Sequence, residues 1–311
     1  MDDKADDTVC PGQKAMTPFD DIYDQPDPRA YFRALEAYEY RTPHHAQGIF
    51  RRTVAARTRA GDARGAEPTA VLDICCSYGI NAALLNYELT LDDLYAHYLS
   101  PQAAALETAE LIEWDRTFYA ARRRPDAVPV FGLDAAANAI AYACTVGLLD
   151  QGFAENLETA PPTAALLGAA RRTRLITITG GASFLSRRTF QPLLAHTEEP
   201  VWVAAFVLRT GSYRHIAECL AEAGLITETT ASPTFPQRRF TSIHERRYAI
   251  EAVTSAGQAP EGKESGGYFH TALHLSRPAV DTHGHPLSDL VAETRTVQPA
   301  VLGLPQQHRL Q

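Results

Sequence analysis

The stretch TAVLDICCSYGINAALL, Thr69 to Leu85, decides the fold of this chain. The apolar run around Asp73 is typical of a buried strand, and Asp73 lies at its carboxyl end. Gly79 closes a short loop of small residues, and the apolar residues 82–85 begin a helix that can pack back on a sheet. The stretch therefore predicts a strand, a tight loop and a helix.

A loop of this kind, at the edge of a parallel sheet, is where doubly wound proteins bind nucleotides. Backbone N–H groups and the N-terminus of the helix converge there. Residues 73–79 read DICCSYG, which lacks two glycines of the G-x-G-x-x-G loop that approaches a pyrophosphate. A dinucleotide site of the dehydrogenase type is therefore disfavoured, and the acid before the loop indicates a ligand with a cationic end.

The pattern resembles motif I of the class I S-adenosylmethionine (SAM) dependent methyltransferases of small-molecule type, a hydrophobic residue followed by D-x-G-x-G-x-G. The family's loop holds the amino-acid end of SAM, so the resemblance implies that this end is bound by Asp73, Cys75, Ser77 and Gly79. The sequence departs from the family at two glycine positions, where Cys and Ser adopt positive φ far less readily than Gly. The alternative is an ordinary strand, turn and helix without a ligand.

The next predicted strand, Val128 to Asp134, also ends in a carboxylate. Asp134 can accept hydrogen bonds from both vicinal hydroxyls of a ribose, and Ala135 follows it at the start of a helix. Capping that helix is an alternative role of Asp134 and is compatible with the first.

A short third strand is predicted over residues 152–157, GFAENL. The resemblance implies that Asn156 accepts from the adenine amino group while the backbone N–H of Leu157 meets a ring nitrogen.

The fourth predicted strand, Arg174 to Thr179, precedes the loop Gly180 to Ser183. In the family this loop lies near the reactive sulfonium, so the resemblance places Thr179 and Gly180 in the cofactor site. The loop has no N-P-P-Y or D-P-P-Y motif, which amino-methylating DNA enzymes use to hold a base. Together with a net charge of −8, this argues against a nucleic-acid partner.

Further strands are predicted over residues 201–208, 225–230 and 268–275, with helices between most of them. The fold class is α/β: a doubly wound, seven-stranded, mostly parallel sheet of the Rossmann-like methyltransferase type, whose last strand is antiparallel. The expected divisions are a disordered N-terminus (1–16), a helical cap or lid (17–66), a SAM-binding domain (67–280) with a helical insert (about 88–126), and an irregular tail (281–311).

Two features of these segments have two interpretations each. The tyrosines of the N-terminal segment, Tyr23, Tyr31 and Tyr38, either fold over the cofactor as a lid or form the core of a helical cap. The arginines 122–124 form either an anion clamp or, more simply, a solvated helix end.

The composition, 45% hydrophobic and 21% charged, is that of a soluble globular protein without a membrane partner. The acidic N-terminus and the absence of an apolar run of about 20 residues predict a cytoplasmic protein. The five cysteines form no C-x-x-C pair, and a strand would separate His270 and His274 by about 13 Å, so no metal is expected.

The sequence thus predicts a SAM-dependent methyltransferase that acts on a small-molecule metabolite by direct in-line transfer. Candidates for a catalytic base are Ser183, Tyr23 and His215. One alternative keeps the fold and the cofactor but makes SAM its own substrate, as in the azetidine-2-carboxylate synthases, which release methylthioadenosine. Another is a SAM-binding protein without catalysis.

Overall fold

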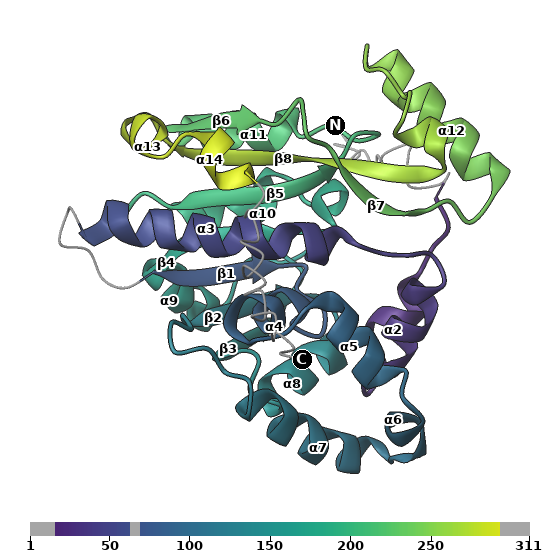
Figure 1. Ribbon diagram of the computed structural model, residues 1–311. Helices are drawn as coiled ribbons and strands as arrows, with labels where there is room; N and C mark the ends of the chain where they lie inside the picture. The colour runs from purple at the N-terminus through teal and green to yellow at the C-terminus, as the bar shows by residue number, and fades with distance from the viewer. Residues whose placement is uncertain (1–15, 63–68, 293–311) are drawn as a thin grey trace, which may run out of the picture.

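The computed structural model describes residues 16–62 and 69–292 (Figure 1), so the prediction for residues 1–16 falls outside it except at residue 16. Its strands form one eight-stranded sheet, which confirms the α/β class. They are β1 (Ala70–Ile74), β2 (Val130–Asp134), β3 (Gln151–Ala154), β4 (Thr173–Ile178), β5 (Trp202–Leu208), β6 (Leu225–Thr229), β7 (Phe235–Arg239) and β8 (Tyr268–Pro278).

The strand order is β3-β2-β1-β4-β5-β8-β6, and β7 pairs with the first residues of β8 outside this path. The strands from β1 to β5 pair in parallel, whereas β8 runs antiparallel between β5 and β6. This order confirms the predicted doubly wound sheet and its antiparallel last strand. The carboxyl ends of β1, β2 and β4 therefore lie at one edge, where parallel sheets of this kind bind ligands.

The seven predicted strands form the main path of the sheet, and β7 is an eighth strand that has no strand pattern in the sequence. Its residues FPQRR lack the apolar alternation of a half-buried strand and include Pro236. Tertiary contacts form it instead. It pairs with β8, the Arg41 N–H donates to the Gln237 carbonyl, and the Arg239 N–H donates to the Tyr38 carbonyl, both at 2.7 Å.

Helices surround the sheet and supply the N-terminal cap. They are α1 (Asp20–Tyr23), α2 (Arg29–Glu36), α3 (Thr42–Asp62), α4 (Ile80–Asn86), α5 (Leu91–Tyr98), α6 (Pro101–Ala105), α7 (Thr108–Ala120), α8 (Ala137–Thr145), α9 (Ala164–Arg172), α10 (Arg187–Leu194), α11 (Arg214–Glu222), α12 (Ile243–Ser255), α13 (Ala279–Gly284) and α14 (Leu287–Val291), with the 3₁₀ turns η2 (Ala182–Phe184) and η3 (Glu264–Gly266). Within the part of the chain that the structure describes, no helix has the length and apolar character of a membrane span.

The two faces of the sheet bury separate cores, because successive side chains of a strand point to opposite faces. In β5, Trp202, Ala204 and Phe206 join the core under α3, α4 and α8, whereas Val203, Ala205 and Val207 join the core under α9, α10 and α11. Figure 1 shows α3 crossing one face of the sheet, with α9 and α10 on the other.

The tail expected from residue 281 onward is not wholly irregular. It contains the end of α13, which packs on β8, and all of α14, which packs on α3. The indole N–H of the fully buried Trp202 donates to Asp281 at 2.9 Å, and Leu290 is buried. Residues 293–311 lie outside the described residues.

The insert between α4 and β2 is helical, as predicted, and one buried carboxylate ties it to the sheet domain. Asp115 of α7 contacts the His97 ring nitrogen at 2.7 Å and accepts a hydrogen bond from Tyr98 at 2.6 Å. It also accepts one from Tyr142 of α8. Because a buried carboxylate is stable only when its oxygens are paired, this network fixes α5 and α7 against α8.

Candidate functional site

The loop between β1 and α4 has the backbone of a glycine-rich loop at positions that are not all glycine. The angle φ is 58° at Cys75, 50° at Ser77 and 77° at Gly79. Positive φ occurs in only a few per cent of non-glycine residues and costs roughly 1–2 kcal/mol for each. Such angles persist where the surrounding structure imposes them, and they cluster at functional sites. These three positions coincide with the three glycines of the motif that the sequence resembles.

Asp134, at the end of β2, holds this loop in place. Its Oδ2 accepts the Ser77 N–H at 2.8 Å, and its Oδ1 accepts the Ala136 N–H at 2.9 Å. Burial raises the pKa of Asp134, while the backbone N–H groups of Ala136, Ser77 and Ala135 act against the increase. The half-buried carboxylate keeps further acceptor positions, since a carboxylate has about four lone-pair sites.

Asp73 is fully buried and has a different role. Its Oδ1 accepts from the Thr177 hydroxyl at 2.7 Å and from Asn81 Nδ2 at 2.9 Å. Burial raises the pKa of Asp73 to about 7; the bonds from Thr177 and Asn81 lower it, and the charge of Asp134 raises it further. Asp73 therefore fixes the orientation of Asn81, which stands between it and the loop after β4.

Asn81 is a site residue that the sequence analysis missed. Its Nδ2 also donates to the Thr179 hydroxyl at 2.9 Å, so the amide bridges β1 and the loop after β4. Its Oδ1, like the Ser77 hydroxyl, is buried without a hydrogen-bond partner among the described residues. The one available signal was an amide in the first turn of an otherwise apolar helix.

The loop after β4 touches the loop after β1. Gly181 has φ of 73°, and a Cβ added there would lie 2.6 Å from the Cys75 sulfur, so both its angle and its surroundings require glycine. A Cβ on Gly180 would lie 3.4 Å from the Tyr40 hydroxyl. Thr179 and Gly180 are thus brought next to the β1 loop, and Tyr40 of the cap covers them.

The predicted adenine-binding residues are less clearly arranged. Asn156 is exposed, and its side-chain oxygen accepts the Glu158 N–H at 3.0 Å within its own turn. Leu157 is buried. The Glu155 N–H donates to the Asp134 carbonyl at 3.0 Å, which ties this segment to the end of β2. The assignment of Asn156 and Leu157 to adenine stays a prediction.

The N-terminal cap is bonded to the loop after β1 and to the turn after β2. The Tyr78 hydroxyl accepts the Gln25 N–H and donates to the Gln25 carbonyl, both at 2.9 Å. Asp24 Oδ1 accepts the Asn138 N–H at 2.7 Å, at the first turn of α8. The cap therefore closes over the β1 loop and over the turn that follows Asp134.

Aromatic rings fill the space beneath the cap. The ring centroids of Tyr31 lie 5.7 Å from Tyr23 and 6.0 Å from Tyr78. Burial raises the pKa of Tyr78 to about 12 and that of Tyr31 well above its ordinary value. Both phenols are therefore neutral at neutral pH and can donate hydrogen bonds.

The three candidate bases lie in different places. Tyr23 lies in the cap, at the edge of the Tyr31 ring. Ser183 is an exposed residue of η2. His215 belongs to α11, and its Nε2 lies 3.0 Å from the Leu185 carbonyl. The structure brings Thr179, Gly180 and the β1 loop together but does not gather these three side chains into one group.

The arginines at the end of α7 are engaged locally. Arg122 donates to the Phe118 carbonyl at 2.9 Å, and Arg124 pairs with Glu88 at 2.6 Å and with Asp126 at 3.0 Å. These contacts favour the helix-end interpretation over an anion clamp.

The two histidines of β8 bond to neighbouring hydroxyls. His270 Nδ1 lies 3.2 Å from the Thr234 hydroxyl, and His274 Nδ1 lies 2.9 Å from that of Thr229. Across residues 16–62 and 69–292, no group of three or more His, Cys, Asp or Glu side chains is arranged to hold a metal ion.

Two pockets, of about 370 and 270 Å³, lie outside this site. The larger is lined by the ends of β5 and β6 and the middle of β8, and the smaller lies between α2 and α6. Neither is lined by Asp73, Asp134 or the β1 loop, because the cap packs against that part of the sheet edge.

No family model and no curated protein matches this sequence. Solved structures do match it. The plantazolicin methyltransferase BpumL, in complex with a triazolic desmethylPZN analog and SAH, is 13% identical, with 81% of this chain and 91% of that chain covered and a TM-score of 0.38. The YcgJ protein from Bacillus subtilis is 12% identical, with 76% and 98% covered and a TM-score of 0.41. The [4+2]-cyclase SpnF is 11% identical, with 74% and 81% covered and a TM-score of 0.36.

The strand order, the antiparallel β8 between β5 and β6, and the loop after β1 define the class of this fold. The chain has the Rossmann-like fold of the class I methyltransferases.

Proposed function

We propose that this chain is an enzyme that binds SAM at the carboxyl ends of β1, β2 and β4 and transfers its methyl group to a small-molecule metabolite. The observation that supports it most is the β1 loop, where Cys75 and Ser77 have the positive φ angles of the family's glycines. A chain under no constraint would relax such angles, since each costs roughly 1–2 kcal/mol. The N–H groups of Cys75, Ser77 and Gly79 are bonded within the protein, so the support for a ligand comes from the strained shape of the loop and not from free backbone donors.

The polar atoms around the loop fit the amino-acid end of SAM. Asn81 Oδ1 can accept from an ammonium, and the Ser77 hydroxyl can donate to a carboxylate; both lack a partner among the described residues. A buried polar atom without a partner costs about 1–3 kcal/mol, which a bound ligand would recover. In this proposal Asp73 is a positioning residue, because its bond to Asn81 Nδ2 turns Oδ1 of the same amide outward.

Asp134 and the segment after β3 would hold the adenosine. The unused acceptor positions of the Asp134 carboxylate suit the two ribose hydroxyls. Ala135 lies beside that carboxylate, and its N–H acts on it. Leu157 offers an apolar surface and a backbone N–H to the adenine ring, and the Asn156 side-chain oxygen, which accepts one bond from Glu158, keeps a second lone pair for the adenine amino group.

Bound SAM supplies an electrophilic methyl group on a sulfonium. The chain's own contribution is to align the acceptor and exclude water, and effective molarities from such alignment are worth about 7–11 kcal/mol. Thr179 and Gly180 would lie beside the sulfonium, under Tyr40. Tyr23, Ser183 and His215 remain the candidates for removing a proton from the acceptor.

The experiment is incubation of the protein with SAM and a metabolite extract from the producing organism. We expect adenosylhomocysteine to accumulate, together with a metabolite that is heavier by one methylene. Asp134→Ala should abolish both, whereas Asp126→Ala, which removes an exposed carboxylate outside the site, should have no effect. Absence of adenosylhomocysteine from every extract would contradict methyl transfer.

A second function is favoured by the cap. Gln25 bonds to Tyr78 on the β1 loop, and Asp24 bonds to Asn138 after β2, so the cap lies over the parts of the proposed site that would hold the amino-acid end and the ribose. Such an enclosure suits an enzyme that uses SAM as its only substrate, in which the amine of SAM attacks its own chain carbon and releases methylthioadenosine. Chromatography of SAM incubated with the protein alone separates the two functions. Methylthioadenosine formed without an acceptor would support cyclisation.

A further inference from the structure

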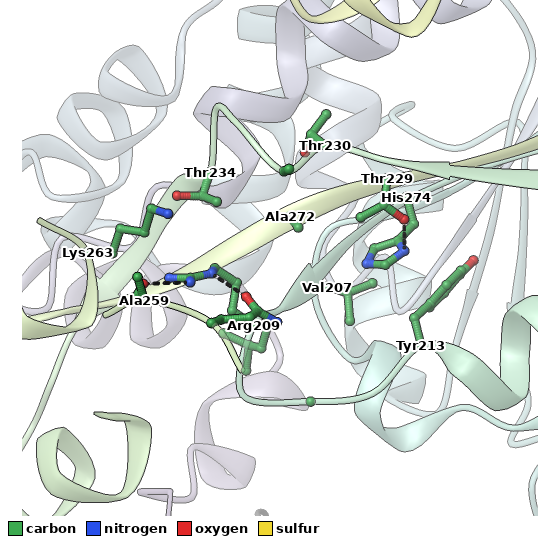
Figure 2. Close-up of a pocket in the computed structure, with 14 residues that line it drawn as sticks. Val207, Arg209, Tyr213, Thr229, Thr230, Thr234, Ala259, Lys263, Ala272 and His274 are labelled. Carbon is green, nitrogen blue, oxygen red and sulfur yellow. Dashed lines mark hydrogen bonds between the residues drawn. The ribbon is translucent and has the colours of Figure 1, made fainter. Parts of the chain in front are cut away.

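The pocket of about 370 Å³ shares no residue with the proposed SAM site. It is formed by the ends of β5 and β6, the middle of β8 and the segment that leads to η3 (Figure 2). Its volume lies in the range of small-molecule sites, about 300–1,000 Å³. Its fourteen lining residues include Arg209 and Lys263 and no carboxylate.

Arg209 builds one wall of the pocket. It is buried, and each of its side-chain nitrogens donates to the chain between Gln258 and the start of η3: Nε to Gln258 at 2.9 Å, Nη2 to the Ala259 carbonyl at 3.0 Å and Nη1 to Glu264 at 2.5 Å. Because Glu264 is fully buried behind the pocket, its carboxylate compensates the guanidinium charge. Arg209 therefore fixes the wall, and its charge is already matched.

Lys263 is different, because its charge acts on the neighbouring Glu264 without forming an ion pair with it. Among the described residues its ammonium has no hydrogen-bond or ion-pair partner. Figure 2 shows its side chain extending toward Thr234. The sequence has only three lysines, Lys4, Lys14 and Lys263, among 29 basic residues. An ammonium is a compact point charge that suits a single anionic group.

The opposite side of the pocket is lined by uncharged aromatic rings and apolar side chains. The rings of Tyr213 and His274 lie 4.5 Å apart between centroids, with Val207 and Ala272 beside them. Burial lowers the pKa of His274 to about 4, so its imidazole is neutral at neutral pH. Figure 2 shows Tyr213 and Lys263 on opposite sides of the pocket. An occupant would thus meet a cation at one end and apolar, ring-bearing walls at the other.

We propose that this pocket is a binding site for a small organic anion, whose carboxylate or phosphate group is held by Lys263 and whose apolar body packs against Val207, Ala272 and the Tyr213 ring. The site does not depend on the proposed function at the SAM loop, because the two share no residue.

The test uses the full-length protein and five probes in calorimetric titrations: benzoate, phenyl phosphate, benzyl alcohol, benzylamine and inorganic phosphate. We expect benzoate or phenyl phosphate to bind at one site per chain, at least about tenfold more tightly than benzyl alcohol, because only the anions make a charge-assisted hydrogen bond. The tighter of the two anions identifies the carboxylate or the phosphate as the natural group. Inorganic phosphate and benzylamine should bind at least tenfold more weakly than the better anion.

Lys263→Met should weaken binding of that anion about tenfold or more, whereas Lys263→Arg should change it less than about threefold. Arg116→Met is the matched control, since it removes one positive charge from an exposed pair on α7 and should have no effect. Equal thermal unfolding midpoints and equal far-ultraviolet circular dichroism spectra would show that Lys263→Met leaves the rest of the protein intact.

A second measurement locates the probe. The better anion should slow modification of Lys263 by an amine-reactive reagent, followed by mass spectrometry of its peptide. The proposal is overturned if neither anion binds the wild-type protein, if Lys263→Met binds as tightly as the wild type, or if Lys263 reacts at the same rate with and without the anion.

Discussion

Cys75 and Ser77 hold backbone angles that glycine adopts freely and most other residues avoid. Adjacent Cys76 is not among the residues with positive φ and is buried. The two adjacent cysteines therefore have the same side chain, but only Cys75 has a positive φ angle. The backbone strain at Cys75 can therefore be measured by replacing Cys75 and, for comparison, Cys76 with glycine.

We predict opposite results for the two replacements. Cys75→Gly should leave the free energy of unfolding unchanged or raise it by about 1 kcal/mol, because relief of the positive φ offsets the entropy of glycine. Cys76→Gly should lower it by about 2 kcal/mol, because it removes a buried side chain from a packed core and adds the same entropy. Urea unfolding of both variants decides this, and equal losses would mean that the loop is not strained at Cys75.

The raised pKa of Asp73 predicts that the stability of the protein depends on pH. Its pKa is raised from 3.8 to about 7, chiefly by burial, so the protonated form is favoured in the folded chain. A carboxyl group with a raised folded pKa stabilises the protein fully below pH about 4, and this contribution is lost as the pH rises through about 7. The ionisation of Asp73 should therefore lower the free energy of unfolding by up to a few kcal/mol between pH 4 and pH 8. The histidines His45, His270 and His274, whose pKa values burial lowers to about 4, act in the opposite direction, so the effect of Asp73 is measured as the difference between the wild type and a variant.

Asp73→Asn, which cannot ionise, should not show this loss. Unfolding midpoints of the two proteins at unit steps of pH would measure the difference. Asp126→Asn, at an exposed position, is the control and should follow the wild type. Parallel curves for wild type and Asp73→Asn would show that Asp73 does not titrate in this range.

At the scale of elements, the cap and α8 depend on each other. The helix α8 has no side-chain cap of its own at Ala136, and Asp24 of the cap supplies the acceptor for the Asn138 N–H. A carboxylate at this end of a helix also interacts favourably with the helix dipole. The same contact therefore fastens the cap and completes a helix that follows Asp134.

Asp24→Ala should lower the free energy of unfolding by about 1 kcal/mol, the usual effect of removing an N-cap acceptor. It should also raise the amide exchange rate at the first turn of α8 and weaken binding of adenosylhomocysteine several-fold. Asp24→Asn, which keeps an acceptor oxygen, should retain most of the wild-type stability, amide protection and affinity for adenosylhomocysteine. If amide exchange in α8 is unchanged in Asp24→Ala, then the cap does not stabilise this helix.

The elements around the site were predictable to the extent that local patterns determine them. Asp73 and Asp134 could be found because each ends an apolar run. Asn81 and Tyr40 could not, because their roles come from contacts with Thr179 and Gly180, about a hundred residues or more away along the chain. The strand β7 was missed for the same reason, since its polar residues form a strand only through β8 and the cap.

At the scale of the whole molecule, residues after 280, which the sequence predicted to be an irregular tail, are bonded to the core of the sheet. Asp281, in α13, accepts the indole N–H of Trp202, which is fully buried in the central strand β5. The fully buried Arg277 packs over the same indole, 5.1 Å from its ring, and pairs with Glu228 at 2.6 Å. The C-terminal part of the described chain is therefore bonded to the middle of the core.

Asp281→Ala should lower the free energy of unfolding by about 1–3 kcal/mol, because it leaves the buried Trp202 N–H without an acceptor. Asp289→Ala, at an exposed position a few residues later, should change it by less than about 0.5 kcal/mol. Denaturant unfolding followed by tryptophan fluorescence measures both variants. Equal effects of the two replacements would argue against the bond between α13 and β5.

A crystal structure of the protein grown with adenosylhomocysteine would show whether the carboxyl ends of β1 and β2 hold an adenosyl amino acid. We predict the amino-acid end of the ligand at Asn81 and the loop of residues 75–79, with both ribose hydroxyls within hydrogen-bond distance of Asp134. Ligand bound elsewhere, or a site at these strand ends that stays filled by Tyr40 and the cap in the presence of saturating ligand, would contradict it.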